Sequence, residues 1–344
     1  MRVSLTIGTL ALTLLAIDAL SGMSLAEEAV PVTIDNFVRA ETDGAFGGEV
    51  KLGGWATLRH HRTPISLDEQ VVPRINRDTL YSTGVFDLDA GPVTITMPDS
   101  SGRFMSLIVI DEDHYVRGVY YGPGNHTLSK DDIGTRYVFA ALRTLVNPDS
   151  PDDVKAVHAL QDAAKVEQQG GPGKFEIPNW DQASLKKIHA ALLVLNETLP
   201  DLRHAFGSKE EVDPVRHLIG TASAWGGNPD KDAIYLNVTP EKNDGRTIYK
   251  LTAKDVPVDA FWSITVYDAK GMLQKNDFNA YNVNSTTAMK NSDGSITTQF
   301  GGCDGKIPNC VPIMPGWNYI VRLYRPRANV LDGSWTFPES QPMS

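Results

Sequence analysis

Short runs of β-forming residues, separated by turn residues, occur in two blocks of this sequence and constrain its fold more than any other feature. The first block holds four runs that are rich in Val, Ile, Thr, Phe and Tyr: residues 81–88, 93–97, 104–110 and 137–145. Turn-forming pairs such as Gly91-Pro92 and Ser101-Gly102 lie between them. This pattern is typical of antiparallel strands in a β-sandwich or barrel.

The second block begins near Ala233 and repeats the same pattern. Its β-type runs cover residues 234–238, 248–252, 261–267, 296–300 and 319–324. Turn signals such as Asn243-Asp244-Gly245 and Ser292-Asp293-Gly294 separate them. Because strands and helices do not alternate regularly, a doubly wound parallel fold is disfavoured.

Helix signals lie between the two blocks. Ser150, followed by Pro151, has the order expected of a helix start, and Asp181 and Asp213 are expected to cap two further helices. Near the N-terminus, Asp35 is expected to cap a short helix, which a loop through glycines 47, 48, 53 and 54 would follow.

The predicted fold class is therefore α+β, mainly β with a helical insert. We expect two antiparallel β-sandwich or jelly-roll-like modules joined by a few helices. The predicted domain boundaries are 30–150 for the N-terminal β module, 151–228 for the helical insert and 229–340 for the C-terminal β module.

The first 26 residues predict export. A positive start at Arg2, an apolar stretch over residues 3–17 and the small-x-small pattern Ser24-Leu25-Ala26 are typical of a signal peptide cleaved after residue 26. The alternative is a membrane anchor, but Asp18 ends the apolar run before the roughly 20 residues that a span needs. The expected mature protein is periplasmic or secreted, with no membrane association after cleavage.

The two cysteines and the charge agree with this prediction. Cys303 and Cys310 would form a disulfide in an oxidising compartment, whereas zinc would need more ligands than two thiols provide. The net charge is −10, from 42 acidic and 32 basic residues, without a basic run. A nucleic-acid partner is therefore not expected, because such surfaces need concentrated positive charge.

Several motifs resemble two domains of unknown function. The resemblance to the domain of unknown function 1254 rests on residues 72–82 (VPRINRDTLYS), 85–88 (VFDL), 93–98 (VTITMP) and 111–115 (DEDHY). The resemblance to the domain of unknown function 1214 rests on residues 261–267 (FWSITVY), 316–319 (GWNY), 322–327 (RLYRPR) and 332–335 (DGSW). It implies an exported bacterial protein with two β-sandwich-like domains and helices between them, and it implies no particular reaction.

The first candidate ligand-binding cluster is Asn76, Arg77, Asp78 and Tyr81. Entering a strand, these residues could present a guanidinium, a carboxylate and a phenol to a sugar or a carboxylate. The alternative is structural, with Arg77 and Asp78 paired to neighbouring loops at the start of the strand.

The second candidate cluster follows an apolar strand and contributes Asp111, His114 and Tyr115. A cation held by carboxylates is conceivable there, as is a His114 general base oriented by Glu112. The alternative is a strand end with turn-forming acids. No metal site is predicted, because no fixed-spacing zinc motif occurs.

The third candidate set is Tyr267, Arg322 and Tyr324. Strand alternation sends residues 262, 264 and 266 to the core and residues 263, 265 and 267 toward solvent or a cleft. Arg322 and Tyr324 could then join Tyr267 around a polar ligand, because aromatic rings beside hydrogen-bonding groups suit carbohydrates. The alternative is that the same residues simply cover an exposed sheet.

No cofactor is predicted. The esterase elbow, the phosphate-binding loop, the dinucleotide fingerprint and the His-Glu-x-x-His motif are all absent from the sequence. The leading hypothesis is binding of a polar small molecule or carbohydrate in a cleft between the two β modules. The alternatives are a cofactor-independent hydrolase or lyase acting on a glycan or related substrate through Arg77, Asp78, Tyr81 and His114, and a structural or surface-interaction protein. The sequence leaves open whether the protein is an enzyme, and its oligomeric state.

Overall fold

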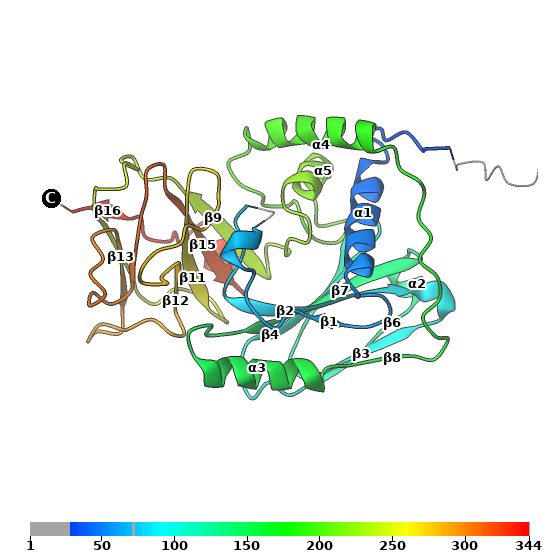
Figure 1. Cartoon of the computed structure of the whole chain (residues 1–344), viewed down its shortest axis with the longest axis horizontal. Helices are drawn as coiled ribbons and strands as arrows, with labels where there is room; N and C mark the ends of the chain where they lie inside the picture. Colours follow the sequence, from blue (N-terminus) through cyan, green and yellow to red (C-terminus); the bar gives the residue numbers. More distant parts are fainter. Residues whose placement is uncertain (1–27, 71–72, 344) are drawn as a thin grey trace, which may run out of the picture.

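The computed structural model of the protein describes residues 28–70 and 73–343 (Figure 1). The predicted signal peptide, residues 1–26, lies outside the described residues. No helix in these ranges has the length and apolar composition that crossing a membrane requires.

The first module is a five-stranded antiparallel sheet faced by a three-stranded sheet. The large sheet has the order β1 (Arg59–His60), β2 (Thr79–Asp87), β7 (Tyr137–Leu145), β4 (Met105–Asp111) and β5 (Val116–Tyr121). The small sheet has the order β6 (Gly124–Leu128), β3 (Val93–Met97) and β8 (Lys165–Gln168). Apolar side chains from both sheets, among them Ile95, Leu107 and Leu142, form one buried core between them.

Helices cover the other face of the large sheet (Figure 1). Phe46 of α1 (Phe37–Lys51) packs there against Val85, Ile108 and Phe139. The helices α4 (Gln182–Asn196) and α5 (Pro214–Ser223) form a second apolar cluster with α1. The remaining helical elements are η1 (Leu67–Glu69), η2 (Leu88–Ala90), α2 (Lys130–Ile133), α3 (Pro151–Ala163) and α6 (Ala328–Leu331).

The second module is a sandwich of two four-stranded sheets. One has the order β14 (Cys310–Val311), β13 (Ile296–Phe300), β10 (Tyr249–Ala253) and β16 (Gln341–Pro342). The other has the order β12 (Asn282–Asn284), β11 (Trp262–Tyr267), β15 (Asn318–Tyr324) and β9 (Ala233–Val238). All ladders of this module are antiparallel except the short β13–β14 pair. The predicted α+β class, mainly β, is confirmed.

Strand alternation places the core of the second module as expected. Trp262, Ile264 and Val266 lie between the two sheets, together with Val321 and Leu323 of β15. The sequence predicted that the opposite face of β11 would lie toward solvent or a cleft, and this prediction was wrong. Ser263, Thr265 and Tyr267 are fully buried because this face packs against the first module.

Three predicted helix starts are confirmed by side-chain caps. The side chains of Ser150, Asp181 and Asp213 accept backbone hydrogen bonds at the starts of α3, α4 and α5. The prediction for α1 was wrong in its cap and its length. Asn36 precedes this helix without a side-chain capping bond, and the helix continues through glycines 47 and 48. Burial of Phe37, Ala40 and Phe46 outweighs the low helix propensity of these glycines.

Candidate functional site

Polar candidate residues from both modules meet at the junction between them. The side-chain amide of Asn76 donates to the phenol oxygens of Tyr81, at 3.3 Å, and Tyr324, at 3.0 Å. One of these tyrosines lies on β2 of the first module and the other on β15 of the second. The first and third candidate sets therefore form one hydrogen-bonded network, which we call the junction network.

Asp78 crosses the junction. Its carboxylate is buried and accepts hydrogen bonds from Ser263 Oγ at 2.5 Å, Asn282 Nδ2 at 3.1 Å and Asn284 Nδ2 at 3.0 Å. All three donors belong to strands β11 and β12 of the second module. Buried carboxylates need such partners to offset the loss of hydration. Asp78 thus holds the side chains of two neighbouring strands in place.

Arg322 occupies the same buried face. Its guanidinium donates to Thr265 Oγ1 at 2.9 Å, to the phenol of Tyr267 at 2.7 Å and to the carbonyl of Arg74 at 3.0 Å. Burial alone would lower the pKa of Arg322, but Tyr267, Tyr324 and Asp78 raise it. Arg322 is therefore a charged residue inside the junction, held by partners of both modules.

Tyr81 has an unusual electrostatic environment. Burial would raise the pKa of its phenol, but the guanidinium of Arg143 and hydrogen bonds such as that from Asn76 lower it. Arg143 lies over the Tyr81 ring at 5.5 Å from its centroid. Arg143 also donates to Asn228 Oδ1 at 2.6 Å.

Arg77 does not join its sequence neighbours. Its guanidinium lies over the ring of Tyr281, 4.9 Å from the centroid, while Asp78 points into the junction. Burial lowers the pKa of Arg77, and Tyr281 and Asp149 partly compensate. The expected presentation of Arg77, Asp78 and Tyr81 to one ligand was therefore wrong.

The second candidate cluster is separate from the junction network and is saturated by structural bonds. Asp111 accepts from the backbone amides of Asp113 and Tyr115 and from Arg117 Nε. His114 Nδ1 pairs with Thr221 Oγ1 at 2.8 Å, and its Nε2 accepts from the amide of Gly226 at 2.8 Å.

Burial also lowers the pKa of His114 far below its usual range, and the nearby imidazole of His217 adds to this effect. Glu112 does not orient His114, because its carboxylate accepts from the amide of Tyr137. Tyr115 stacks on His217 with ring centroids 4.6 Å apart. His114 therefore has no free ring nitrogen for the general-base role.

An open groove lies next to the junction network, on the side of β12. It has a volume of about 350 Å³. Its walls are strand β12 with the turn before it, the loop between the two cysteines, and Asp149 of the first module. The lining residues are Asp149, Phe278, Asn279, Ala280, Tyr281, Asn282, Val283, Asn284, Thr287, Ala288, Cys303, Gly305, Ile307, Asn309 and Cys310.

Asp78 connects the junction network to this groove. Because it fixes the Nδ2 groups of Asn282 and Asn284, it determines how these groove amides are oriented. Asn279 Nδ2 donates to Asp149 Oδ1 at 3.2 Å across the module boundary. Within the described part of the chain, Asn282 Oδ1, Asn279 Oδ1 and Asp149 Oδ2 have no hydrogen-bond donor. The groove thus offers hydrogen-bond acceptors.

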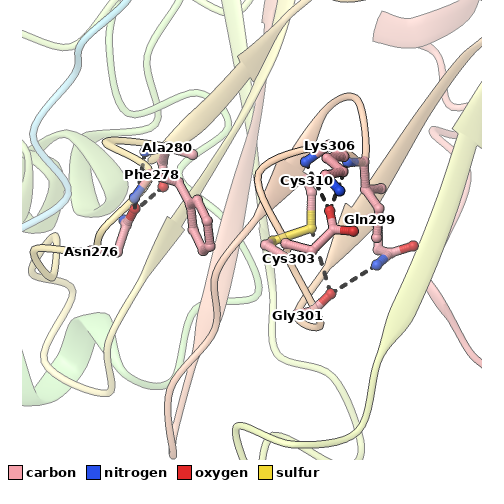
Figure 2. Close-up of a disulfide and its surroundings, with 10 residues drawn as sticks. Asn276, Phe278, Ala280, Gln299, Gly301, Cys303, Lys306 and Cys310 are labelled. Atoms are coloured by element: carbon pink, nitrogen blue, oxygen red, sulfur yellow. Dashed lines mark hydrogen bonds between the residues drawn. A yellow bond between two sulfur atoms is a disulfide. The ribbon is translucent and has the colours of Figure 1, made fainter.

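The predicted disulfide is present and forms one wall of the groove. Cys303 and Cys310 are joined with their Cα atoms 5.6 Å apart. Figure 2 shows that the ring of Phe278 points toward this loop from the opposite wall. Cys310 Sγ also lies 3.6 Å from the carbonyl of Gly301. The bridge therefore fixes the position of a groove wall.

The sequence patterns did not identify most groove residues. Asn282 and Asn284 are two positions apart on a strand, a spacing that would have placed both on one face. Phe278 lies in a turn, for which strand periodicity gives no signal. Among the described residues, no group of three or more His, Cys, Asp or Glu side chains is arranged to hold a metal ion.

Two family models match the chain in the expected order. Residues 55–131 match the protein of unknown function DUF1254, and residues 233–328 match the protein of unknown function DUF1214. No curated protein matches the chain.

Solved structures share the fold. The VPA0106 protein from Vibrio parahaemolyticus is 17% identical, with a TM-score of 0.70, covering 90% of this chain and 98% of its own. An uncharacterized protein from Burkholderia cenocepacia is 12% identical, with a TM-score of 0.51, covering 90% of this chain and 88% of its own. At these identities the similarity shows the fold alone.

Proposed function

The chain belongs to the proteins in which DUF1254 is followed by DUF1214, and on this premise we propose that it is an exported protein that binds a polar small molecule in the groove beside its module junction. Neither domain has an assigned reaction, so the proposal rests on the site. The single observation that carries it is the set of oriented amide side chains in an open groove of about 350 Å³. A groove of this size is in the range of small-ligand sites.

The hydrogen-bonding pattern of the groove favours an uncharged ligand that donates hydrogen bonds. Among the described residues, side-chain oxygens of Asn279, Asn282 and Asp149 have no hydrogen-bond donor and can accept from a ligand. No Lys, Arg or His is among the described residues that line the groove. An anionic ligand would therefore meet acceptors and the carboxylate of Asp149, and the nearby guanidinium of Arg77 already lies against Tyr281 and interacts with this carboxylate.

The walls of the groove are held in fixed positions, as is expected of a ligand-binding site. The carboxylate of Asp78 holds two groove amides from behind, and the disulfide holds the opposite loop. Preorganised groups lose less conformational entropy when a ligand binds. The buried network of the junction thus supports the ligand site without contacting the ligand itself.

A thermal-shift screen of the mature protein tests this proposal. The library should contain sugars, polyols, amino acids, nucleosides and organic acids at millimolar concentration. We expect uncharged compounds rich in hydroxyl groups to raise the melting temperature, because a ligand that binds only the folded state stabilises it.

A steric plug and a matched variant locate the site. Thr287 is exposed and lines the groove, whereas Thr252 is exposed on β10 outside it. Thr287→Trp should abolish the shift and Thr252→Trp should preserve it. Absence of any shift, or a shift that survives Thr287→Trp, would contradict the proposal.

One observation favours the alternative of a cofactor-independent lyase or hydrolase. The lowered pKa of Tyr81 beside Arg143 is the kind of environment that activates a phenol as a base. If turnover of a glycan is detected, Tyr81→Phe should lower it by about 100-fold or more. His114 and Asp78 would act only through the fold, since their polar atoms are already engaged.

A further inference from the structure

Phe278 is unusual on this surface. Its side chain is 44% exposed, and it is the one aromatic among the large apolar residues exposed in the described ranges. Other aromatic side chains near the junction, such as Tyr267 and Tyr281, are buried. An exposed phenyl ring at the rim of a polar groove contributes little to the stability of the fold, and exposed apolar groups at such places mark binding sites.

The turn that carries Phe278 is held by its own side-chain bonds. Asn276 Oδ1 accepts from the amides of Phe278, at 3.2 Å, and Ala280, at 3.1 Å, as Figure 2 shows. Asn276 Nδ2 donates to the carbonyl of Ala280 at 2.9 Å. Asn279 adopts a left-handed backbone with φ of 50°, a conformation that Asn tolerates better than most residues. The ring is therefore presented from a defined turn.

The disulfide loop approaches the ring from the other wall. Gly305 has φ of 76°, and a Cβ added there would lie 3.3 Å from Phe278 Cε1. The absence of a side chain at this position lets the loop lie against the phenyl ring. The ring thus has one edge against the loop, and the disulfide keeps the loop in place.

From this arrangement we infer that the ligand of the groove is a neutral saccharide, with one sugar ring stacked on Phe278. This inference rests on the proposed function, because it names the class of ligand for the same groove. The C–H groups on one face of a sugar ring are attracted to the negative face of an aromatic ring. The hydroxyl groups at its edge donate to Asn279 Oδ1, Asn282 Oδ1 and Asp149 Oδ2, which have no donor among the described residues.

Titration calorimetry with a panel of neutral oligosaccharides tests the inference. The panel should contain cellotriose, maltotriose, triacetylchitotriose and xylotriose, with amino acids and free nucleobases as polar compounds that lack a sugar ring. We expect at least one oligosaccharide to bind, and Phe278→Ala to weaken its binding about tenfold. Phe278→Trp should retain the affinity because it keeps the stacking surface. Leu52→Ala, which truncates an exposed apolar residue of 66% exposure at the end of α1, is the matched control and should bind normally.

The outcomes separate this inference from the proposed function. Binding that Thr287→Trp abolishes, but that only compounds without a sugar ring produce, would overturn the saccharide and leave the polar-ligand groove standing. If Phe278→Ala binds an oligosaccharide with unchanged affinity, stacking on Phe278 is likewise refuted and the polar-ligand groove remains. If no compound of any class binds, both are wrong. Circular dichroism of each variant checks that the substitutions leave the fold intact.

Discussion

The carboxylate of Asp78 is the clearest case of a candidate residue whose role changes once its contacts are known. The sequence placed it among ligand-binding groups, but its oxygens accept from Ser263, Asn282 and Asn284. The alternative prediction, in which Asp78 has a structural role at the start of β2, agrees better with these contacts. The polar character of the residue could be predicted, but the partners could not, because they lie about 200 positions away in the sequence.

Truncation of this carboxylate should be strongly destabilising. Asp78→Ala leaves three side-chain donors without their buried acceptor and removes a negative charge that stabilises the charged form of Arg322. We expect the free energy of unfolding to fall by about 3 to 5 kcal/mol in urea titrations. Asp35→Ala removes an exposed carboxylate that caps no helix and should change stability by less than about 0.5 kcal/mol. Equal effects of the two variants would refute the role assigned to Asp78.

We expect the titration of Asp43 to make the free energy of unfolding depend on pH. Burial, together with the charge of Glu112, raises the pKa of its carboxyl from 3.8 to about 6, although Trp180 donates a hydrogen bond to it. A raised pKa means that the folded state binds the proton more tightly than the unfolded state. The stabilising contribution is therefore complete below pH 3.8 and is lost as the pH rises through about 6.

Asp43→Asn should remove this dependence, because the amide cannot ionise and can still accept from Trp180. Relative to the native protein, the variant should gain about 2 to 3 kcal/mol of unfolding free energy between pH 4 and pH 7.5. Urea denaturation at a series of pH values measures the difference. A difference that stays constant with pH would show that Asp43 titrates normally.

Among the elements, the disulfide was predicted from the sequence, whereas the length of helix α1 was not. The bridge between Cys303 and Cys310 could be predicted because the sequence has two cysteines and the expected compartment is oxidising. The length of α1 could not be predicted, because its glycines disfavour a helix and only packing of Phe46 against the large sheet outweighs them. Strands with a regular pattern were found, whereas the strands β5 and β6 between the third and fourth runs were missed. Glycines and polar residues, including Gly118 and Asn125, interrupt their pattern.

The disulfide should stabilise the second module modestly. Replacing both cysteines by serine is expected to lower the free energy of unfolding by about 2 kcal/mol, because the bridge closes a short loop. Guanidinium titrations of the native and variant proteins measure the change. Addition of reductant should reproduce the loss in the native protein and leave the variant unchanged, and a reductant effect on the variant would point to another cause.

At the scale of the whole molecule, the two modules share a buried interface in which polar groups lie beside apolar clusters. Arg322 and Asp78 are both buried, and their partners come from both modules. The number and class of the modules could be predicted from strand periodicity, which is a local property. The junction network and the groove could not, because they require the relative position of two modules that no local pattern specifies.

This interface should make unfolding cooperative across the chain. We expect the native protein to unfold in urea in one transition that tryptophan fluorescence and circular dichroism follow together. Asp78→Ala should shift both signals together to a lower urea concentration, because the carboxylate stabilises the interface that both modules share. Separate transitions in the native protein would contradict a rigid junction.

The groove itself is tested most directly by a crystal structure of the protein soaked with the compound that gives the largest thermal shift. The account predicts electron density for that compound between strand β12 and the disulfide loop, with hydrogen bonds to Asn282 Oδ1 and Asn279 Oδ1. Density at another surface, such as beside Tyr81, with the groove containing only solvent would contradict it.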